Sequence, residues 1–333
     1  MKKTIFVVDD SLSNLTRAAE TLNPHYTVMT IPSGSKAISI LEKVRPDLIL
    51  LDIEMPEMDG FEVLRFLKNS DRYKSIPVIF LTAKTDHQTE IEALELGVVD
   101  FITKPFNPAV LLHRVKHHID ISGLVIERTA QLYSANQDLI FVLADIVENR
   151  DETTGGHLGR TSRLVKMMLE KMLENKVYYD QIKDWDFDLI AECSLLHDVG
   201  KINTPDAILK KPDKLTLEEF EIMKNHALAG KSIIEKIVAR SGENVFLNNA
   251  KIFAFSHHER WNGTGYPEGL KGEEISLQGR IMAIVDVYDA LISKRSYKDA
   301  FTKDHAIKII SEERGLHFDP AIVDVFCDIW GEV

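Results

Sequence analysis

Two adjacent histidines followed by a glycine-rich loop are the first feature of this sequence with clear chemical potential. The stretch HHERWNGTGYPEG covers residues 257–269. Each neutral imidazole carries one donor and one acceptor, and both must be satisfied if the ring is buried. A metal ion would satisfy the pair, and the glycines would let the following backbone approach a ligand beside Tyr266. Taken alone, the stretch is equally compatible with a surface loop after a helix.

Further histidines and carboxylates interrupt the apolar stripes in the second half of the chain. They lie in the motifs GGHLGR, LLHDVGK, KNHALAG and AIVDVYDAL, and are His157, His197, Asp198, His226 and Asp286. A single histidine at an apolar helix end is usually a hydrogen-bonded core residue. With His257 and His258, however, the set contains five imidazoles and two carboxylates. This set favours a pair of borderline transition metals that share one carboxylate.

Polar side chains also follow the apolar runs in the first third of the chain. The residues that close these runs are Asp9, Asp10, Asp52, Thr82 and Lys104. In parallel sheets, ligands collect at the carboxyl ends of the strands, so these side chains are expected to converge. Carboxylates so close together repel one another unless a hard cation lies among them, and ligation by oxygen alone favours Mg²⁺.

The elements that must position these residues follow from the hydrophobic rhythm. Short β-rich runs alternate with helical spacing in the first third, namely TIFVV, YTVMT, DLILLD, PVIFLT and DFITK. This alternation predicts an α/β domain with a doubly wound, five-stranded parallel sheet. From about Asp145 onward the pattern is helical, which predicts an all-α domain. We therefore expect a multidomain protein with a first domain at 1–121, a helical linker at 122–144 and a helical domain at 145–333.

Length and composition exclude several classes of protein. A chain of 333 residues exceeds what one core comfortably holds. Its net charge of -12 argues against general nucleic-acid binding. The sequence also shows no basic recognition helix, which argues against a DNA-binding output. The first apolar run ends at Asp9, too early for a signal peptide or a spanning helix, so we expect a cytoplasmic protein without a membrane segment. Its 2 cysteines are too few for a disulfide framework or a thiolate metal site.

The segment from Pro108 to Arg150 has strong helical character. Apolar residues recur in it at seven-residue intervals: Leu112, Ile119, Ile126, Tyr133, Ile140 and Val147. The other half of a heptad seam is interrupted by polar residues and by Gly123, which costs about 1 kcal/mol relative to alanine within a helix. Two interpretations remain open, an interrupted helix that packs on its own domain and the parallel stalk of a homodimer.

Residues 1 to about 120 resemble the receiver domain of bacterial two-component response regulators. The motifs that carry the resemblance are VVDD, LLDIEMPEMDG, LTA and FITKPF. The resemblance implies that Asp52 accepts a phosphoryl group from a sensor histidine kinase or another phosphodonor. It also implies Mg²⁺ ligation by Asp9, Asp10 and Asp52, phosphoryl contacts by Thr82 and Lys104, and an aromatic switch at Phe101. A carboxylate is a competent phosphoryl acceptor once a cation and a lysine neutralise the developing charge.

Residues from about 145 to 333 resemble the HD-GYP family, the branch of the HD phosphohydrolases that hydrolyses cyclic di-GMP. The matching motifs are TGGHLGR, LLHDVGKINTPDAILKKPDKLTLEEFEIMKNH, HHERWNGTGYPEGLKGEEI and DVYDALISKRSYK. The resemblance implies one metal held by His157, His197, Asp198 and Asp286, and a second held by His226, His257, His258 and the bridging Asp198. It also implies catalytic roles for Asp198 and Lys201, and cyclic-dinucleotide contacts for Lys201, Tyr266, Arg295 and Lys298.

The activity implied by this resemblance is hydrolysis of cyclic di-GMP to pGpG or GMP, controlled by phosphorylation of Asp52. Two alternatives remain open: a catalytically idle cyclic di-GMP receptor or protein-interaction module, and a phosphohydrolase of another nucleotide. The family's pattern favours iron or manganese, while ligation by nitrogen and oxygen also admits cobalt, nickel or zinc.

The number of metal ions is a further expectation. Some members of the family hold a third metal through a glutamate one helical turn before the first histidine, where this chain has Thr153. Threonine lacks the charge and reach of a carboxylate. The neighbouring Glu152 would point about 100° away on a regular helix. We therefore expect two ions in this centre.

Overall fold

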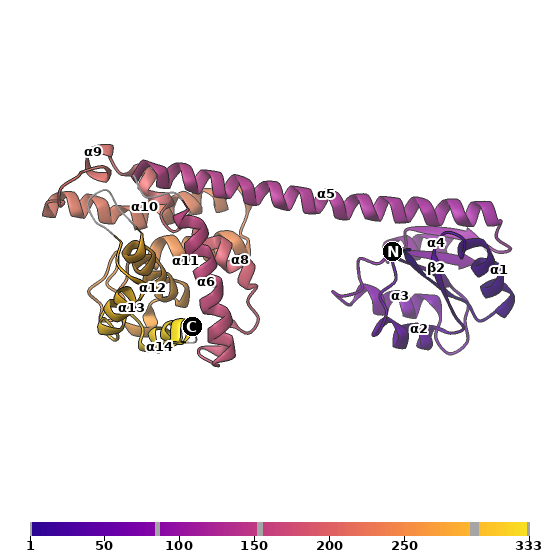
Figure 1. The fold of residues 1–333 in the computed structure, drawn as a ribbon. Coiled ribbons are helices and arrows are strands. Elements are labelled where there is room, and N and C mark those ends of the chain that lie inside the picture. Colours follow the sequence, from indigo (N-terminus) through magenta and orange to yellow (C-terminus); the bar gives the residue numbers. More distant parts are fainter. Residues whose placement is uncertain (1, 84–86, 152–155, 294–299, 332–333) are drawn as a thin grey trace. The chain divides into compact units, whose positions relative to one another are not determined.

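A computed structural model describes residues 2–83, 87–151, 156–293 and 300–331. The chain divides into two compact units, Met1–Leu132 and Tyr133–Val333, and each is described by itself (Figure 1). The division falls within one helix. Four positions discussed above, Glu152, Thr153, Arg295 and Lys298, lie outside the described residues.

The first unit is built on a parallel sheet, which confirms the predicted α/β fold. Its strands are β1 (Thr4–Val8), β2 (Thr27–Ile31), β3 (Leu48–Asp52), β4 (Val78–Thr82) and β5 (Asp100–Thr103). They lie in the order β2-β1-β3-β4-β5, and every neighbouring pair is parallel. The strand order changes direction between β1 and β3, so a crevice opens at the carboxyl ends of these two strands, where such sheets bind ligands.

Helices cover both faces of this sheet because side chains alternate along each strand. They are α1 (Leu12–Leu22), α2 (Gly34–Leu41), α3 (Gly60–Lys68), α4 (His87–Glu95) and the first turns of α5 (Pro108–Glu148). Ile5 and Val7 of β1 pack with buried residues of α1 and α5. Phe6 and Val8 face the opposite core, which is lined by α2 and α3. The two cores fix the carboxyl ends of the strands in place.

Helix α5 is continuous from Pro108 to Glu148, and Gly123 does not interrupt it (Figure 1). The apolar stripe predicted at seven-residue intervals is not one exposed seam. Ile119 is buried in the first unit, whereas Val147 is buried in the second and Ile140 packs against its core. The physical reason is helical drift: seven residues fall about 20° short of two full turns, so a strict heptad stripe winds around a straight helix.

The second unit is helical, which confirms the predicted all-α domain. Its α-helices after α5 are α6 (His157–Glu174), α7 (Tyr179–Ile182), α8 (Phe187–Cys193), α9 (Asp206–Leu209), α10 (Leu217–Ser241), α11 (Val245–Ser256), α12 (Leu277–Ile292), α13 (Lys303–Glu312) and α14 (Pro320–Gly331). Short 3₁₀ turns are η1 (Asn149–Asp151), η2 (Ser194–Leu196), η3 (Val199–Asn203) and η4 (Gly272–Glu274).

Helix α12 forms the centre of this unit. Every residue from Leu277 to Val285 is buried, and most are apolar, as expected for a helix that is covered on all sides. It packs against α6, α11 and α13. None of the helices in the described ranges has the length and apolar character needed to cross a membrane.

Candidate metal centre and phosphoacceptor site

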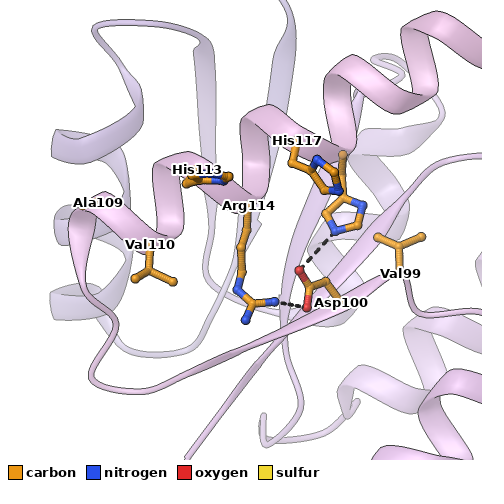
Figure 2. Close-up of a pocket in the computed structure, with 8 residues that line it drawn as sticks. Val99, Asp100, Ala109, Val110, His113, Arg114 and His117 are labelled. Carbon is orange, nitrogen blue, oxygen red and sulfur yellow. Dashed lines mark hydrogen bonds and ion pairs between the residues drawn. The ribbon is translucent and has the colours of Figure 1, made fainter.

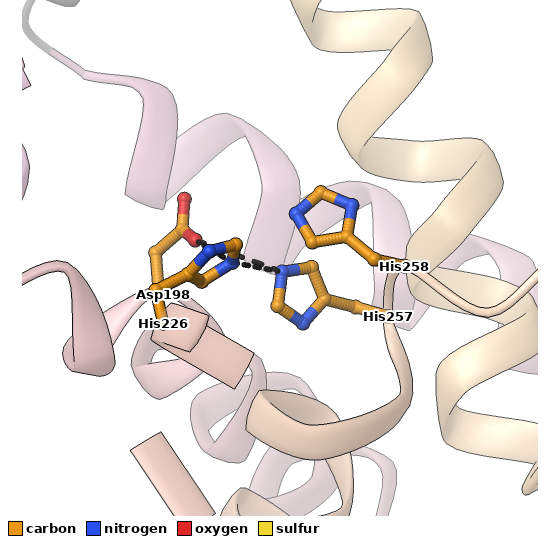
Figure 3. Close-up of side chains that lie close together, drawn as sticks. All are labelled: Asp198, His226, His257 and His258. Carbon is orange, nitrogen blue, oxygen red and sulfur yellow. Dashed lines mark hydrogen bonds and ion pairs between the residues drawn. The ribbon is translucent and has the colours of Figure 1, made fainter. Parts of the chain in front are cut away.

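The histidines and carboxylates of the second half come together from five separate segments of the chain. His157 begins α6, His197 and Asp198 lie between η2 and η3, and His226 lies within α10. The pair His257 and His258 follows α11, and Asp286 lies on α12. Their candidate ligand atoms form two groups in which all atoms lie within 4.8 Å of one another. One group is Asp198, His226, His257 and His258 (Figure 3), and the other is His157, His197 and Asp286.

Backbone carbonyls orient three of these imidazoles. The distance from the ring Nδ1 to a backbone carbonyl oxygen is 2.8 Å between His197 and Ser194. It is 2.7 Å between His226 and Met223, and 2.9 Å between His257 and Phe253. A carbonyl oxygen can only accept, so Nδ1 carries the donated proton in each ring. The lone pair of a neutral ring is therefore on Nε2, the usual arrangement for a histidine that binds a metal.

These lone pairs face one another and the carboxylate of Asp198. The Nε2 atoms of His226 and His257 are 3.4 Å apart, and lie 3.3 Å and 3.6 Å from Asp198 Oδ1. The other oxygen, Oδ2, is 3.4 Å from His197 Nε2. His197 Nε2 and Asp198 Oδ1 are buried without a hydrogen bond. Buried acceptors that converge in this way fit metal ligation, with one Asp198 oxygen directed to each group.

Protonation of the cluster agrees with this interpretation. Burial lowers the pKa of His226 to about 4 and that of His258 well below its ordinary value, so both are neutral near pH 7. Burial also disfavours charge on His197, but Asp198 and Asp286 raise its pKa to about 9. A cation would therefore displace a proton from His197 on binding. Burial opposes ionisation of Asp198, but Lys201, 2.8 Å away, and His197 hold its pKa well below the ordinary value.

The loop after His258 closes one side of the cluster. The ring of Tyr266 lies 4.7 Å from that of His258 and 6.3 Å from that of His226, measured between centroids. Glu259 is 1% exposed and accepts hydrogen bonds from the backbone N–H groups of Glu268 and Leu270, which fixes the loop. The sequence pattern did not indicate Lys224, whose ammonium lies 5.9 Å from the centre of the Tyr266 ring. The loop therefore places the Tyr266 ring beside the histidines, and the Lys224 ammonium lies near that ring.

The close approach of η3 to α10 allows a stability prediction. A Cβ atom added at Gly200 would lie 1.9 Å from the His226 carbonyl oxygen and 2.5 Å from the Gly230 amide nitrogen. We expect Gly200→Ala to lower the free energy of unfolding by about 3 kcal/mol, because neither backbone group can yield without moving α10. Thermal unfolding of Gly159→Ala is the matched control, since its added Cβ would meet nothing within 4 Å on exposed α6. Equal unfolding temperatures for the two variants would contradict this packing.

Three further residues near His157 were not identified from the sequence. Asp289 Oδ2 accepts a hydrogen bond from His157 Nδ1 at 2.6 Å, and Arg160 Nε donates to Asp289 Oδ1 at 2.6 Å. Burial opposes the charge of Asp289, but these two donors lower its pKa to about 2. Glu148, at the end of α5, is buried with Oε1 3.9 Å from His157 Nε2. Asp289 lies three residues after Asp286 on α12, so the two carboxylates lie on the same face of that helix. This spacing is the signal in the sequence that could have identified Asp289.

The polar residues of the first unit also converge, at the carboxyl ends of β1, β3 and β5. Lys104 Nζ lies 2.7 Å from Asp9 Oδ2 and 2.6 Å from Asp52 Oδ2. Asp9 and Asp52 are buried, whereas Asp10 is exposed, and the three carboxylates form a candidate cation group. The sequence analysis did not identify Asn14, whose amide lies 3.0 Å from both Asp9 oxygens. This carboxylate set fits Mg²⁺.

Two remaining residues of this edge lie where the strand register places them. Thr82 is buried at the end of β4, one position beyond the Leu81 partner of Asp52. Phe101 on β5 is partly buried and packs edge-on against Phe80, with 6.2 Å between ring centroids. Burial raises the pKa of Asp52, and Asp9 adds to the effect, while Lys104 opposes it.

A shallow hollow on another face of the first unit is separate from this edge (Figure 2). It is lined by Val99, which precedes β5, by Asp100 at the start of β5, and by residues of α5 such as Val110 and His113. Its carboxylate, Asp100, accepts hydrogen bonds from Arg114 and from His118 Nε2, the latter at 3.1 Å. Because this carboxylate is already paired with two cationic or donor groups, the hollow lacks the converging acceptors seen at the other two sites.

Comparison with known proteins agrees with both sites. Residues 5–116 match the response regulator receiver domain, and residues 141–322 match the HD domain. A Vibrio cholerae protein named "Probable cyclic di-GMP phosphodiesterase" is 40% identical over 97% of this chain and 77% of its own length. The Xanthomonas campestris "Cyclic di-GMP phosphodiesterase response regulator RpfG" is 35% identical over 96% of this chain and 86% of its own.

A third relative carries a different substrate in its name. The "3'3'-cGAMP-specific phosphodiesterase 2" of Vibrio cholerae is 36% identical over 67% of this chain, but the match covers 40% of that protein. The matches to the Vibrio cholerae and Xanthomonas campestris phosphodiesterases each cover at least 96% of this chain, so they span both of its domains. The chain therefore belongs to the family of response regulators in which a receiver domain is followed by an HD-type output domain.

Proposed function

We propose that the second unit hydrolyses cyclic di-GMP to pGpG or GMP, and that phosphorylation of Asp52 in the first unit controls this reaction. The observation that carries the proposal is the position of Asp198, whose two oxygens are directed to two separate histidine groups. The names of the two relatives that match nearly the full chain support the substrate. The idle-receptor alternative is less well supported, because the candidate ligand set is intact.

The residues divide between two ions, for which iron or manganese is favoured. His157, His197 and Asp286 would hold one ion, His226, His257 and His258 would hold the other, and Asp198 would bridge them. When bound, such ions would activate a water molecule and neutralise charge on the phosphodiester.

The chain's own residues provide orientation and charge. Lys201, at 2.8 Å from Asp198 Oδ2, keeps that carboxylate ionised and places an ammonium beside the reacting phosphate. This ammonium balances the charge that develops on the leaving oxygen, or protonates it. Tyr266 presents a ring that can stack on a guanine base. Arg295 and Lys298, which lie outside the described residues, are proposed to pair with the substrate phosphates.

The first unit would receive the signal. Asp9, Asp10 and Asp52 would hold Mg²⁺, and Asp52 would accept the phosphoryl group from a sensor histidine kinase or another phosphodonor. Lys104 already contacts Asp52, so after phosphorylation its ammonium can pair with the phosphoryl oxygens instead of the carboxylate. Thr82 would contact the same phosphoryl oxygens. Phe101 would then repack.

The substrate is tested by product analysis. Metal-loaded protein is incubated separately with cyclic di-GMP, 3'3'-cGAMP, linear pGpG and ordinary nucleotides, and the products are separated by chromatography. We expect cyclic di-GMP to be hydrolysed fastest. Preference for 3'3'-cGAMP would instead support the activity named for the third relative. Binding of cyclic di-GMP without turnover would support the receptor alternative.

We also propose that the chain forms a homodimer through α5, along a seam different from the predicted stripe. Among the exposed apolar residues of α5, Ile121, Val125, Leu132, Leu139, Val142 and Ile146 are each between 44% and 67% exposed and form one series along the helix. Together with Arg128 and Ala135, these positions alternate by four and three, the spacing of a coiled coil. Association of two copies along this series would remove these apolar side chains from water, which favours the dimer.

The seam leads to a testable result. Replacing Leu132 and Leu139 with Glu should convert a dimer into a monomer in analytical ultracentrifugation, because each change places a charge in the apolar contact of both copies. Ile126→Glu is the control, since Ile126 is 68% exposed but lies on a different face of α5. A double variant that sediments as the wild type does, or a control that dissociates equally, would rule out this seam.

A further inference from the structure

The last residue of α5 extends into the candidate metal centre. Glu148 is buried, and its Oε1 lies 3.9 Å from Nε2 of His157. The same nitrogen lies 3.7 Å from Asp286 Oδ1. Two carboxylates from different helices are therefore directed at one imidazole nitrogen, and the family pattern described above does not include Glu148.

The proton on His157 is fixed by its other nitrogen. Nδ1 lies 2.6 Å from Asp289 Oδ2, and Arg160 donates to both Asp289 oxygens, from Nε at 2.6 Å and from Nη2 at 3.0 Å. Asp289 is thereby held as a carboxylate and can only accept, so Nδ1 is the donor. In the neutral ring, Nε2 is then an acceptor that faces two carboxylate oxygens with no proton between them.

The separations fit ligation of one ion. Ligand atoms at about 2.1 Å from a metal are separated by about 3 Å when adjacent and about 4.2 Å when opposite. The distances of 3.7 Å and 3.9 Å at His157 Nε2 fall within this range. Glu148 lies outside the tighter group of His157, His197 and Asp286, so ligation requires its side chain to rotate toward the ion. We infer that Glu148 is a further carboxylate ligand of the ion held by His157, an inference that rests on the proposed metal centre.

The electrostatic surroundings of Glu148 support this role. Glu148 lies within electrostatic range of His157, His197, Asp198 and Lys201. All four of these neighbours belong to the candidate centre. A divalent ion at His157 would therefore lie close to the Glu148 carboxylate and attract it.

Metal content tests the inference without relying on activity. Wild type, Glu148→Gln and Asp145→Asn are loaded with Mn²⁺, dialysed against a weak chelator and analysed for metal and protein. Asp145 lies almost one turn earlier on α5 and bonds to Asn149, so its variant removes a carboxylate from the same helix end but not from the centre. We expect two ions per chain in the wild type and in the control. Glu148→Gln should retain about one, with at least tenfold weaker affinity for the other.

The outcomes are distinguishable. If Glu148 acts only through its charge, Glu148→Gln will still hold two ions per chain, with less than tenfold weaker affinity for either, and this result overturns the inference. A wild type that binds no metal would overturn the proposed function instead. If Glu148→Gln does not fold, Glu148→Asp provides the second variant: it keeps the charge at shorter reach and should weaken one of the two binding steps. Two unchanged binding steps in that variant would also overturn the inference.

Discussion

Asp198→Ala is expected to abolish hydrolysis of cyclic di-GMP, with a fall in kcat of about 10³-fold or more. The substitution removes both oxygens that connect the histidine groups, which lie 3.3 Å from His226 Nε2 and 3.4 Å from His197 Nε2. It also leaves Lys201 without its 2.8 Å carboxylate partner, so an uncompensated positive charge would weaken the binding of any cation nearby.

The measurement pairs turnover with metal content and circular dichroism. We expect Asp198→Ala to lose bound metal while keeping its helical signal, because the helices are held by the apolar core around α12. Asp188→Ala is the control: it removes an exposed carboxylate that pairs with Lys166. Near-normal hydrolysis by Asp198→Ala would rule out the bridging carboxylate.

Asp52→Asn is expected to eliminate phosphorylation of the first unit. Acetyl phosphate with Mg²⁺ should add about one phosphoryl group to the wild type and none to the variant, because an amide oxygen is not a competent nucleophile. Asn keeps the shape of the side chain, so the surrounding contacts of Asp9 and Lys104 should persist. Intact-mass measurement gives the stoichiometry directly.

A control at the opposite end of the same strand separates chemistry from folding. Asp47 precedes β3 and accepts hydrogen bonds from Lys3 and from the Thr4 backbone, away from the phosphoacceptor. Asp47→Asn should therefore be phosphorylated as the wild type is. Phosphorylation of Asp52→Asn to the same extent as the wild type would show that another residue accepts the group.

The sheet and the candidate metal ligands could be identified in the sequence because their patterns are local. Strand β3 is a continuous apolar run that ends in Asp52. The apolar run predicts the strand, and the carboxylate at its end predicts the candidate phosphoacceptor. Likewise, Asp286 stands out as a carboxylate in the apolar helix α12. In both cases a polar residue departs from a regular hydrophobic period, which makes a buried functional group visible in the sequence.

Other features depend on contacts between distant segments. Asn14 reaches Asp9 from an ordinary amphipathic helix, and Lys224 reaches Tyr266 from an exposed turn of α10, so neither interrupts a pattern. The apolar stripe of α5 left two interpretations open for a different reason. A seven-residue repeat gives position along a helix accurately, but the face that a residue occupies drifts with every turn.

The continuity of α5 limits how this output domain can be joined to other sensory domains during evolution. Ala144 of α5 belongs to the core of the second unit and Val147 is buried there, so a gene fusion must retain these turns as part of the transferred module. Upstream of them, each inserted residue would turn the attached domain by about 100° and move it by about 1.5 Å. Insertions of seven residues nearly restore the original phase, so viable fusions should differ in linker length by multiples of seven.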